Sequence, residues 1–240
     1  TYALGDWVFD AGVRWDIEHS TLSYHSYCNT GYNTWHILPD GSRELQSRTP
    51  VVIDDRDRLS QTFNELLPKL TISWHRPWGH IYADITKAYK AGGFNTQMFS
   101  DVLQQRIMNI MGMGMQYSLD EIVSYKPEKS WNYELGASAS LAGGCLDLSA
   151  TAFVIDCRDQ QLTVFPDGST TGRIMTNAGR TLSRGLELSA DWAALEQLKL
   201  RGAWGYTKAT FTEFNNGISD FSGKRVPYAP ANTLYLGAVW

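Results

Sequence analysis

The sequence predicts an antiparallel transmembrane β-barrel, or a segment of one, from three observations. Apolar residues occupy every second position over about ten residues in several segments, as in strands with one face to lipid and one to a polar interior. Short turns alternate with long connections, which is typical of barrels whose turns and loops lie at opposite ends. Tyrosine and tryptophan occur 12 and 9 times among 240 residues, and such amphipathic aromatics gather at membrane interfaces.

The alternation is clearest in three segments. In the first, the apolar set is Trp7, Phe9, Ala11, Val13, Trp15 and Ile17. The same spacing recurs at odd positions from Trp131 to Leu141 and at even positions from Leu186 to Trp192. Because a helix would place its apolar residues three and four apart, the chain is predicted to be all-β. We expect these apolar positions to face lipid and their neighbours to line the interior.

We expect about eight strands in all. Their approximate ranges are 4–18, 62–76, 80–89, 130–142, 145–157, 181–192, 198–211 and 231–240. Short turns and long connections strictly alternate along this order. The first two long connections each have about forty residues, and we expect them to be loops.

Several local signals refine this order. Residues 101–113 have apolar side chains at helical spacing, so they predict a short amphipathic helix whose methionines fill the core of the second connection. Gly143-Gly144 predicts a tight hairpin, and Pro166-Asp167-Gly168 predicts a small hairpin in the third connection. Pro68 predicts a bulge or the beginning of a strand, because proline cannot donate a hydrogen bond to a sheet.

Composition excludes several classes of protein. The net charge of -4 and the pI near 5.7 argue against a nucleic-acid partner. No run reaches the eighteen or so apolar residues of a membrane helix, a test that barrel strands escape. The three cysteines, Cys28, Cys145 and Cys157, form no disulfide framework, and we expect free thiols. With no signal peptide at its beginning, the chain is expected to be mature or an internal fragment.

Enzymatic and metal-binding signals are weak. His19, His25 and His36 share the first connection with Cys28, but their spacing matches no standard zinc pattern. Nothing resembles a nucleophile elbow. We therefore expect no enzyme, no catalytic residue, no metal site and no cofactor.

A soluble β-sandwich is the main competing fold, since its strands also alternate between an apolar and a polar face. The strands expected here have ten or more residues, whereas soluble strands average about five or six. The long connections would also all lie at the same end of the strands, with the short turns at the other end. Both features favour the barrel.

Several motifs add a resemblance to a known family. They are YKAGGFN at Tyr89–Asn95, YKPEKSWNYELG at Tyr125–Gly136, RGLEL at Arg184–Leu188 and VPYAPANTL at Val226–Leu234. In order and spacing these segments resemble the barrel of TonB-dependent outer-membrane receptors. DQQLT at Asp159–Thr163 and GYT at Gly205–Thr207 are similar to the siderophore-receptor-like branch. The resemblance covers nearly the whole chain.

The resemblance implies a function as well as a fold. Such receptors are barrels of about 22 strands around a plug domain. They lie in the outer membrane of Gram-negative bacteria, in contact with its lipid, and import iron–siderophore complexes, haem, cobalamin or glycans with energy relayed by TonB. Since residues 1–240 have room for about eight strands, we expect them to be part of such a barrel, without the plug and the remaining strands. TonB would act through the missing N-terminal part.

An iron–siderophore complex is the first expected substrate. Two other classes of protein stay open: a passive eight-stranded pore or adhesin, and a soluble carbohydrate-binding sandwich. Ligand contacts are expected in the long connections, which meet above the lumen in this topology. The candidate residues are Tyr32, Trp35, His36, Tyr89, Phe94 and Asn95. Aromatic faces beside amide and imidazole groups suit a catecholate complex or a sugar equally well, and packing between loops is the alternative role.

Overall fold

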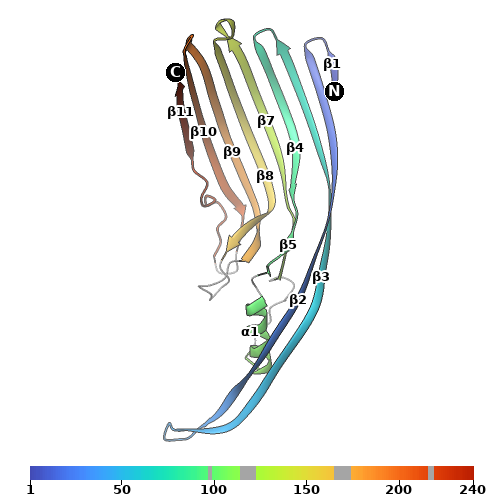
Figure 1. Cartoon of the computed structure of the whole chain (residues 1–240), viewed down its shortest axis with the longest axis vertical. Helices are drawn as coiled ribbons and strands as arrows, with labels where there is room; N and C mark the ends of the chain where they lie inside the picture. The colour runs from blue at the N-terminus through green and yellow to red at the C-terminus, as the bar shows by residue number, and fades with distance from the viewer. Residues whose placement is uncertain (97–98, 114–122, 165–173, 216–218) are drawn as a thin grey trace.

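A single curved antiparallel sheet of nine strands dominates the computed structural model, which describes residues 1–96, 99–113, 123–164, 174–215 and 219–240. The strand order is β1-β2-β3-β4-β7-β8-β9-β10-β11, so each strand pairs with the next strand of this sheet along the chain. Figure 1 shows the sheet as an open wall with β1 and β11 at its two edges. The expected all-β, antiparallel architecture is confirmed.

Most strands of this wall are longer than the sequence predicted, whereas β11 is shorter than the predicted 231–240. Their bounds are β1 Tyr2–Leu4, β2 Trp7–Ile37, β3 Arg43–Arg76, β4 Gly79–Lys90, β7 Glu128–Leu141, β8 Leu146–Val164, β9 Ile174–Leu195, β10 Leu198–Glu213 and β11 Asn232–Val239. Between β4 and β7 the chain forms the two-stranded sheet of β5 Gly93–Phe94 and β6 Ser124–Tyr125, and the helix α1 Phe99–Ile110. The helix confirms the one predicted at 101–113.

The short connections lie together at one end of the wall, at the top of Figure 1. They follow β1, β3, β7 and β9. The turn after β7 contains Gly143 and Gly144 with φ angles of 67° and 91°, a left-handed region that glycine adopts at little cost. The predicted tight hairpin is therefore confirmed. The small hairpin predicted around Pro166-Asp167-Gly168 lies outside the described residues.

The prediction of a forty-residue loop after residue 18 is wrong. β2 and β3 stay paired from Trp7↔Trp74 to Ile37↔Arg43, with one register shift between Thr34 and Trp35. A tight turn closes this hairpin: the amide of Gly41 donates to the carbonyl of Leu38 at 2.9 Å. The outer part of the hairpin, residues 19–61, is called the extension below. Its strands lack apolar alternation because neither face has to meet lipid, while Thr, Tyr, Val and Ile still favour the extended backbone.

Pro68 also departs from the expectation of a bulge or strand start. It lies inside β3 and pairs in regular register with Val13 of β2. On its other side, β3 pairs with β4 from Lys69 onward and not at Pro68. The missing amide hydrogen therefore coincides with the point where β3 leaves β4.

The apolar residues share one face of the wall, as predicted. One row across the register is Trp7, Trp74, Ile81, Ala137, Ala150, Leu188, Trp204 and Leu234. These positions are open to the surroundings: Val13 is 69% exposed and Leu135 59%. A continuous apolar face of this extent requires an apolar environment.

Aromatic side chains gather at the short-turn end of that face. The rings of Trp7 and Trp74 have centroids 6.4 Å apart, and those of Trp74 and Trp78 6.3 Å. The guanidinium carbon of Arg76 lies 4.5 Å from the Trp74 ring centroid. Indole rings beside a cation suit the boundary between lipid and water. Among the described residues, no helix has the length and hydropathy that crossing a membrane requires.

Candidate functional site

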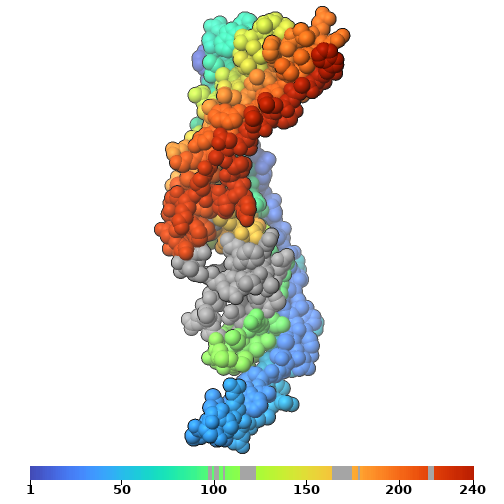
Figure 2. All heavy atoms as spheres, turned by 90° about the vertical axis from the view of Figure 1, so that its left-hand side faces the viewer, coloured from blue at the N-terminus to red at the C-terminus, as the bar shows by residue number. Residues whose placement is uncertain are grey.

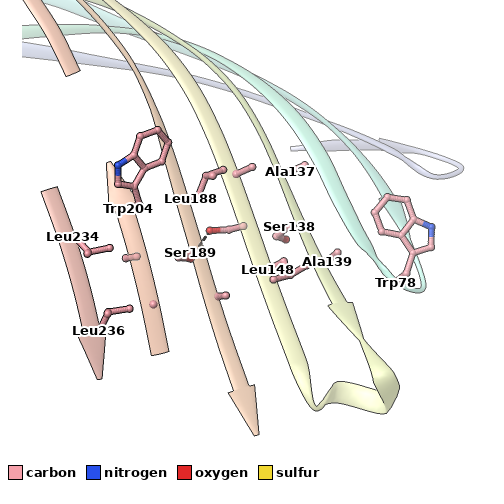
Figure 3. Close-up of a pocket in the computed structure, with 15 residues that line it drawn as sticks. Trp78, Ala137, Ser138, Ala139, Leu148, Leu188, Ser189, Trp204, Leu234 and Leu236 are labelled. Carbon is pink, nitrogen blue, oxygen red and sulfur yellow. Dashed lines mark hydrogen bonds between the residues drawn. The ribbon is translucent and has the colours of Figure 1, made fainter. Parts of the chain in front are cut away.

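A hollow of about 540 Å³ lies in the wall and is lined almost entirely by apolar atoms. Figure 3 shows its lining, with Trp78 and Trp204 on either side of small residues such as Ala137 and Ala139. The pair Ser149 and Ser189 is satisfied within the wall by a hydrogen bond of 2.7 Å. Because specific ligand sites need polar groups that fix orientation, this hollow is a poor candidate for a polar substrate.

The better candidates lie beyond the wall, where the extension meets the second connection. Tyr32 and Trp35 of β2 line a hollow of about 370 Å³ together with Arg43, Met111 and Met113. We call it the tip hollow. His36, the third residue predicted here, is exposed and does not line it.

Helix α1 is held against the extension, as Figure 1 and Figure 2 show. The rings of Phe99 and Tyr24 have centroids 4.5 Å apart. The carboxylate of Asp55 accepts a hydrogen bond from the Tyr24 hydroxyl at 3.3 Å and pairs with the Arg106 guanidinium at 2.8 Å. Burial and the Asp55 carboxylate raise the pKa of Tyr24, so its hydroxyl stays a donor. This docking places Met111 and Met113 beside Tyr32 and Trp35.

Replacing Arg106 by alanine is expected to loosen α1. The ion pair is partly buried, so its loss should cost about 1 kcal/mol of local stability and speed amide exchange in residues 99–110 several-fold. Hydrogen–deuterium exchange measures this directly. The matched control is Arg56→Ala, which removes an exposed ion pair to Asp54 on the same hairpin. Equal exchange in α1 for both variants would contradict the docking role.

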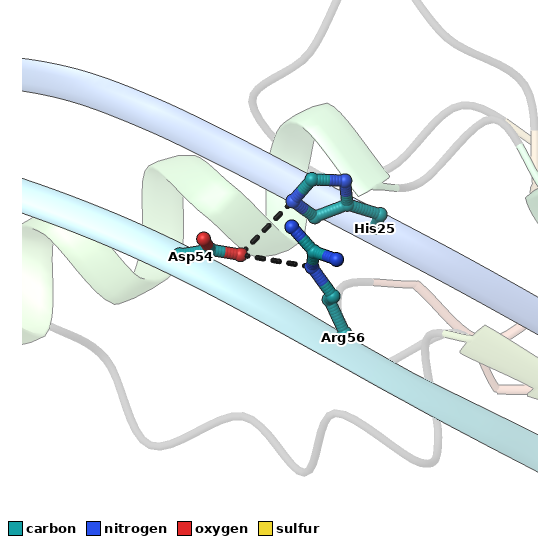
Figure 4. Close-up of polar contacts among 3 residues, drawn as sticks. All are labelled: His25, Asp54 and Arg56. Carbon is teal, nitrogen blue, oxygen red and sulfur yellow. Dashed lines mark hydrogen bonds and ion pairs between the residues drawn. The ribbon is translucent and has the colours of Figure 1, made fainter.

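Figure 4 shows that exposed cluster of the extension. His25 Nε2 and Arg56 Nε lie 2.9 and 3.3 Å from the same oxygen of Asp54. Partial desolvation raises the pKa of Asp54, but the hydrogen bonds from His25 and Arg56 outweigh it, so the pKa lies below its ordinary value. The ion pair between Arg56 and Asp54 therefore contributes to stability at neutral pH, and this contribution is lost only when acid protonates Asp54. In the part of the chain that the structure describes, no group of three or more potential metal ligands converges.

Tyr89 lies away from the tip hollow, at the end of β4. It lines a second hollow of about 470 Å³ with Asp16 and Glu18 of β2, which we call the rim hollow. The Tyr89 hydroxyl is buried and has no hydrogen-bond partner among the described residues. Nearby, Glu65 of β3 pairs with Lys87 and, at 2.5 Å, with Lys129. These charges bridge the gap that opens where β3 leaves β4.

Phe94 and Asn95 lie between the two hollows, at the base of the second connection. Asn95 is 8% exposed. Its side-chain oxygen accepts from the amide of Met175 at 2.8 Å, and its side-chain nitrogen donates to the Met175 carbonyl at 2.9 Å. The side-chain amide of Asn95 thus pairs with the β9 backbone as a neighbouring strand would. The structure brings Tyr32 and Trp35 together but separates them from Tyr89, Phe94 and Asn95.

Two further amides, which sequence reasoning did not single out, hold the same base. The side-chain nitrogen of Gln161 donates to the carbonyls of Ala91 and Lys126 at 2.7 and 3.2 Å. Asn177 accepts from the Lys126 amide at 2.8 Å and donates to its carbonyl at 2.9 Å. Both ends of the second connection are therefore fixed to β8 and β9. We call Asn95, Gln161 and Asn177 the amide latch.

Glycines make this close packing possible. A Cβ atom at Gly92 would lie 2.3 Å from the Tyr125 carbonyl oxygen and 2.9 Å from the Phe63 ring. Only a residue without a side chain fits between β6 and the hairpin. The Gly92-Gly93 pair thus serves close packing.

Comparison with known proteins identifies the family. The whole chain, residues 1–240, matches the family model described as "TonB dependent receptor-like, beta-barrel". The comparison with curated protein sequences gives no match.

Several solved structures have the same fold. The ferric yersiniabactin uptake receptor FyuA from Yersinia pestis has a TM-score of 0.62 at 20% identity, over 98% of this chain and 29% of its own. The ferric-catecholate import receptor Fiu from E. coli K12 has a TM-score of 0.59 at 17% identity, over 98% and 30%. The siderophore receptor PiuA from Acinetobacter baumannii has a TM-score of 0.60 at 13% identity, over 97% and 28%. The chain thus spans less than a third of the length of each of these proteins.

Proposed function

Because this chain belongs to the TonB-dependent receptor-like β-barrel family, we propose that it forms part of an active importer that binds a scarce nutrient, with an iron–siderophore complex as substrate. Its place is the outer membrane of a Gram-negative bacterium, as for the family. The short turns then face the periplasm, and the extension with α1 faces outside. The apolar face of the wall contacts lipid.

The observation that carries this proposal is the one-sided wall with its long extension. A soluble sandwich would cover the apolar face with a second sheet, whereas this face is open in the described structure. A passive pore or adhesin would share the wall, but the family consists of receptors that transport. For the same reason we propose no enzymatic activity.

The neighbours in structure support the substrate class. The names of FyuA and Fiu describe receptors for ferric complexes. Haem, cobalamin and glycans are the other substrates that the family allows. Energy would come from TonB, acting through a plug domain on the N-terminal side of the complete protein.

We propose Tyr32, Trp35, His36, Tyr89, Phe94 and Asn95 as residues of the ligand path, in two roles. Tyr32 and Trp35 offer aromatic faces in the tip hollow, and the neighbouring His36 is open to incoming ligand. Tyr89 lines the rim hollow, and its hydroxyl has no hydrogen-bond partner among the residues that the structure describes. Asn95 holds the base on which these surfaces depend, with Phe94 beside it.

Uptake by cells that carry the complete receptor tests this proposal. Import of a labelled ferric siderophore is expected to require the receptor and an intact TonB system, and to stop when either is deleted. Alanine at Trp35, Phe94 and Asn95 should weaken binding without removing the barrel from the membrane. Uptake that persists without TonB would favour a passive pore.

A further inference from the structure

Two histidines lie side by side at the short-turn end of the wall. His75, near the end of β3, and His80, at the beginning of β4, are direct partners across the tight hairpin that joins these strands. Their rings are stacked, with centroids 5.3 Å apart and an angle of 21° between the ring planes. Both residues alternate with the apolar neighbours Trp74 and Ile81, so the imidazoles project from the interior face of the wall.

The backbone brings these two side chains close together. The amide of His75 donates to the carbonyl of Asp6 at 2.8 Å, on the side of β3 that faces β2. Because the amide and carbonyl of one strand residue point to the same side, His75 and His80 pair without backbone hydrogen bonds between them. Residues in such a pair have Cα atoms about 4.5 Å apart, the closer of the two spacings in an antiparallel sheet. Both imidazoles can therefore reach the same small ion.

Serine hydroxyls hold one nitrogen of each ring. The Ser73 Oγ atom lies 2.9 Å from His75 Nε2, and Ser73 is only 9% exposed. The Ser138 Oγ atom lies 3.0 Å from His80 Nδ1. Among the described residues, His75 Nδ1 and His80 Nε2 have no hydrogen-bond partner. When each serine accepts from its ring, the second nitrogen carries a lone pair, and this outer hydrogen bond is the usual support of a metal-binding histidine.

The pair is open to solvent, and the charges next to it are matched. His75 is exposed and His80 is half-buried. The carboxylate of Asp6 and the guanidinium of Arg76 pair at 2.8 Å. That guanidinium lies over the ring of Trp74, on the apolar face. A positive ion therefore approaches the imidazoles from the interior without meeting this cation.

We propose that His75 and His80 bind one divalent transition-metal ion, with copper(II) preferred. Imidazole is a good ligand for copper, nickel and zinc, and copper(II) binds most tightly in this series. Nitrogen–metal bonds of about 2.0–2.1 Å place two ligand nitrogens about 3 Å apart. The two rings reach this spacing by turning about their Cβ–Cγ bonds, a torsion with broad minima. No metal site was expected from the sequence, because the spacing from His75 to His80 matches no standard pattern until the hairpin pairs the two residues.

The test titrates the complete receptor in detergent with Cu²⁺ after removal of metals by a chelator. Calorimetry gives the affinity, and electron paramagnetic resonance counts the imidazole nitrogens on the bound ion. The wild type is expected to show an ion with two imidazoles. His75→Ala and His80→Ala should each leave one imidazole, and the double variant should lose this ion. Ser73→Ala should keep both imidazoles but weaken binding about tenfold, as the loss of an outer-shell partner does.

His19 provides the matched control. It is an exposed histidine whose Nδ1 atom lies 2.8 Å from the Thr62 hydroxyl, so its ring is held in the same way. Its direct partner across the hairpin is Thr62 rather than a second histidine. His19→Ala should therefore leave the ion with two imidazoles unchanged. Mg²⁺, which prefers oxygen ligands, should not compete for the site.

The outcomes decide the proposal independently of the proposed function. Loss of the ion in the double variant, together with its retention in His19→Ala, establishes the site. If the double variant binds Cu²⁺ with the same stoichiometry, affinity and spectrum as the wild type, the site is wrong. A wild-type spectrum without an ion held by two imidazoles contradicts it as well. Should an alanine variant fail to assemble, His75→Asn and His80→Asn repeat the comparison with polar side chains, and either result leaves the importer unaffected.

Discussion

Replacing Leu135 by lysine should prevent most of the protein from assembling in the membrane. Leu135 is the middle of the apolar row of β7, and its register partners Ala83 and Ala152 are small, so its side chain stands open to lipid. A lysine near the middle of the membrane on a lipid-facing strand costs about 2–4 kcal/mol. Such a cost reduces the assembled fraction by roughly one and a half to three orders of magnitude if assembly is at equilibrium.

The neighbouring residue provides the control for this experiment. Glu134 lies on the other face of the same strand and accepts a hydrogen bond from Asn132 at 2.5 Å. Glu134→Lys changes the net charge more than Leu135→Lys does, but it places the ammonium in the polar interior. Resistance of the folded barrel to unheated detergent electrophoresis measures the assembled fraction. Equal assembly of the two variants would contradict the assignment of faces.

Sequence reasoning succeeded where the membrane imposes a rule on every residue. Lipid on one face forces an apolar side chain at every second position, and this pattern is visible without any tertiary contact. The rule ends at Ile17, and so the prediction of a strand ended there although the hairpin continues. Beyond lipid, backbone pairing needs no apolar face, and the strand loses its signature.

The turn of the extension did carry a readable signal. Pro39-Asp40-Gly41 has the same turn chemistry as Pro166-Asp167-Gly168, which predicts a hairpin. Applied at residues 39–41, that reasoning would have predicted a hairpin between two β-forming segments. The expected long loop therefore came from giving hydrophobic alternation priority over turn chemistry.

The candidate site was predictable in part. Long connections rich in aromatic residues pointed to Tyr32 and Trp35, and these do share a hollow. Arg43 lines the same hollow only because the closing turn brings the start of β3 opposite the end of β2. The roles of Asn95 and Asn177 depend on partners about eighty and fifty residues away along the chain, and no local pattern reports such contacts.

The amide latch leads to the second large effect, at Gln161. This residue is 8% exposed and its side-chain nitrogen joins Ala91 and Lys126, the two ends of the second connection. Leucine has a similar volume but cannot donate, so Gln161→Leu removes the donor to the Ala91 carbonyl, while the Lys126 carbonyl keeps its bond from Asn177. Because an unpaired group of this kind costs about 1–3 kcal/mol, the connection should lose about that much local stability. Amide exchange in residues 91–96 and 123–126 should rise about fivefold or more.

Gln160 offers a control of the same residue type one position away. Its side-chain oxygen is buried without a hydrogen-bond partner among the described residues, so Gln160→Leu removes an unsatisfied group and should be neutral or slightly stabilising. If both leucine variants left amide exchange in these segments unchanged, the latch would not stabilise the second connection. If Gln161→Leu alone loosens them while the barrel stays assembled, the wall and the second connection are separate units of stability. The tip hollow then depends on the latch, because the latch holds the base from which α1 reaches the extension and completes that hollow.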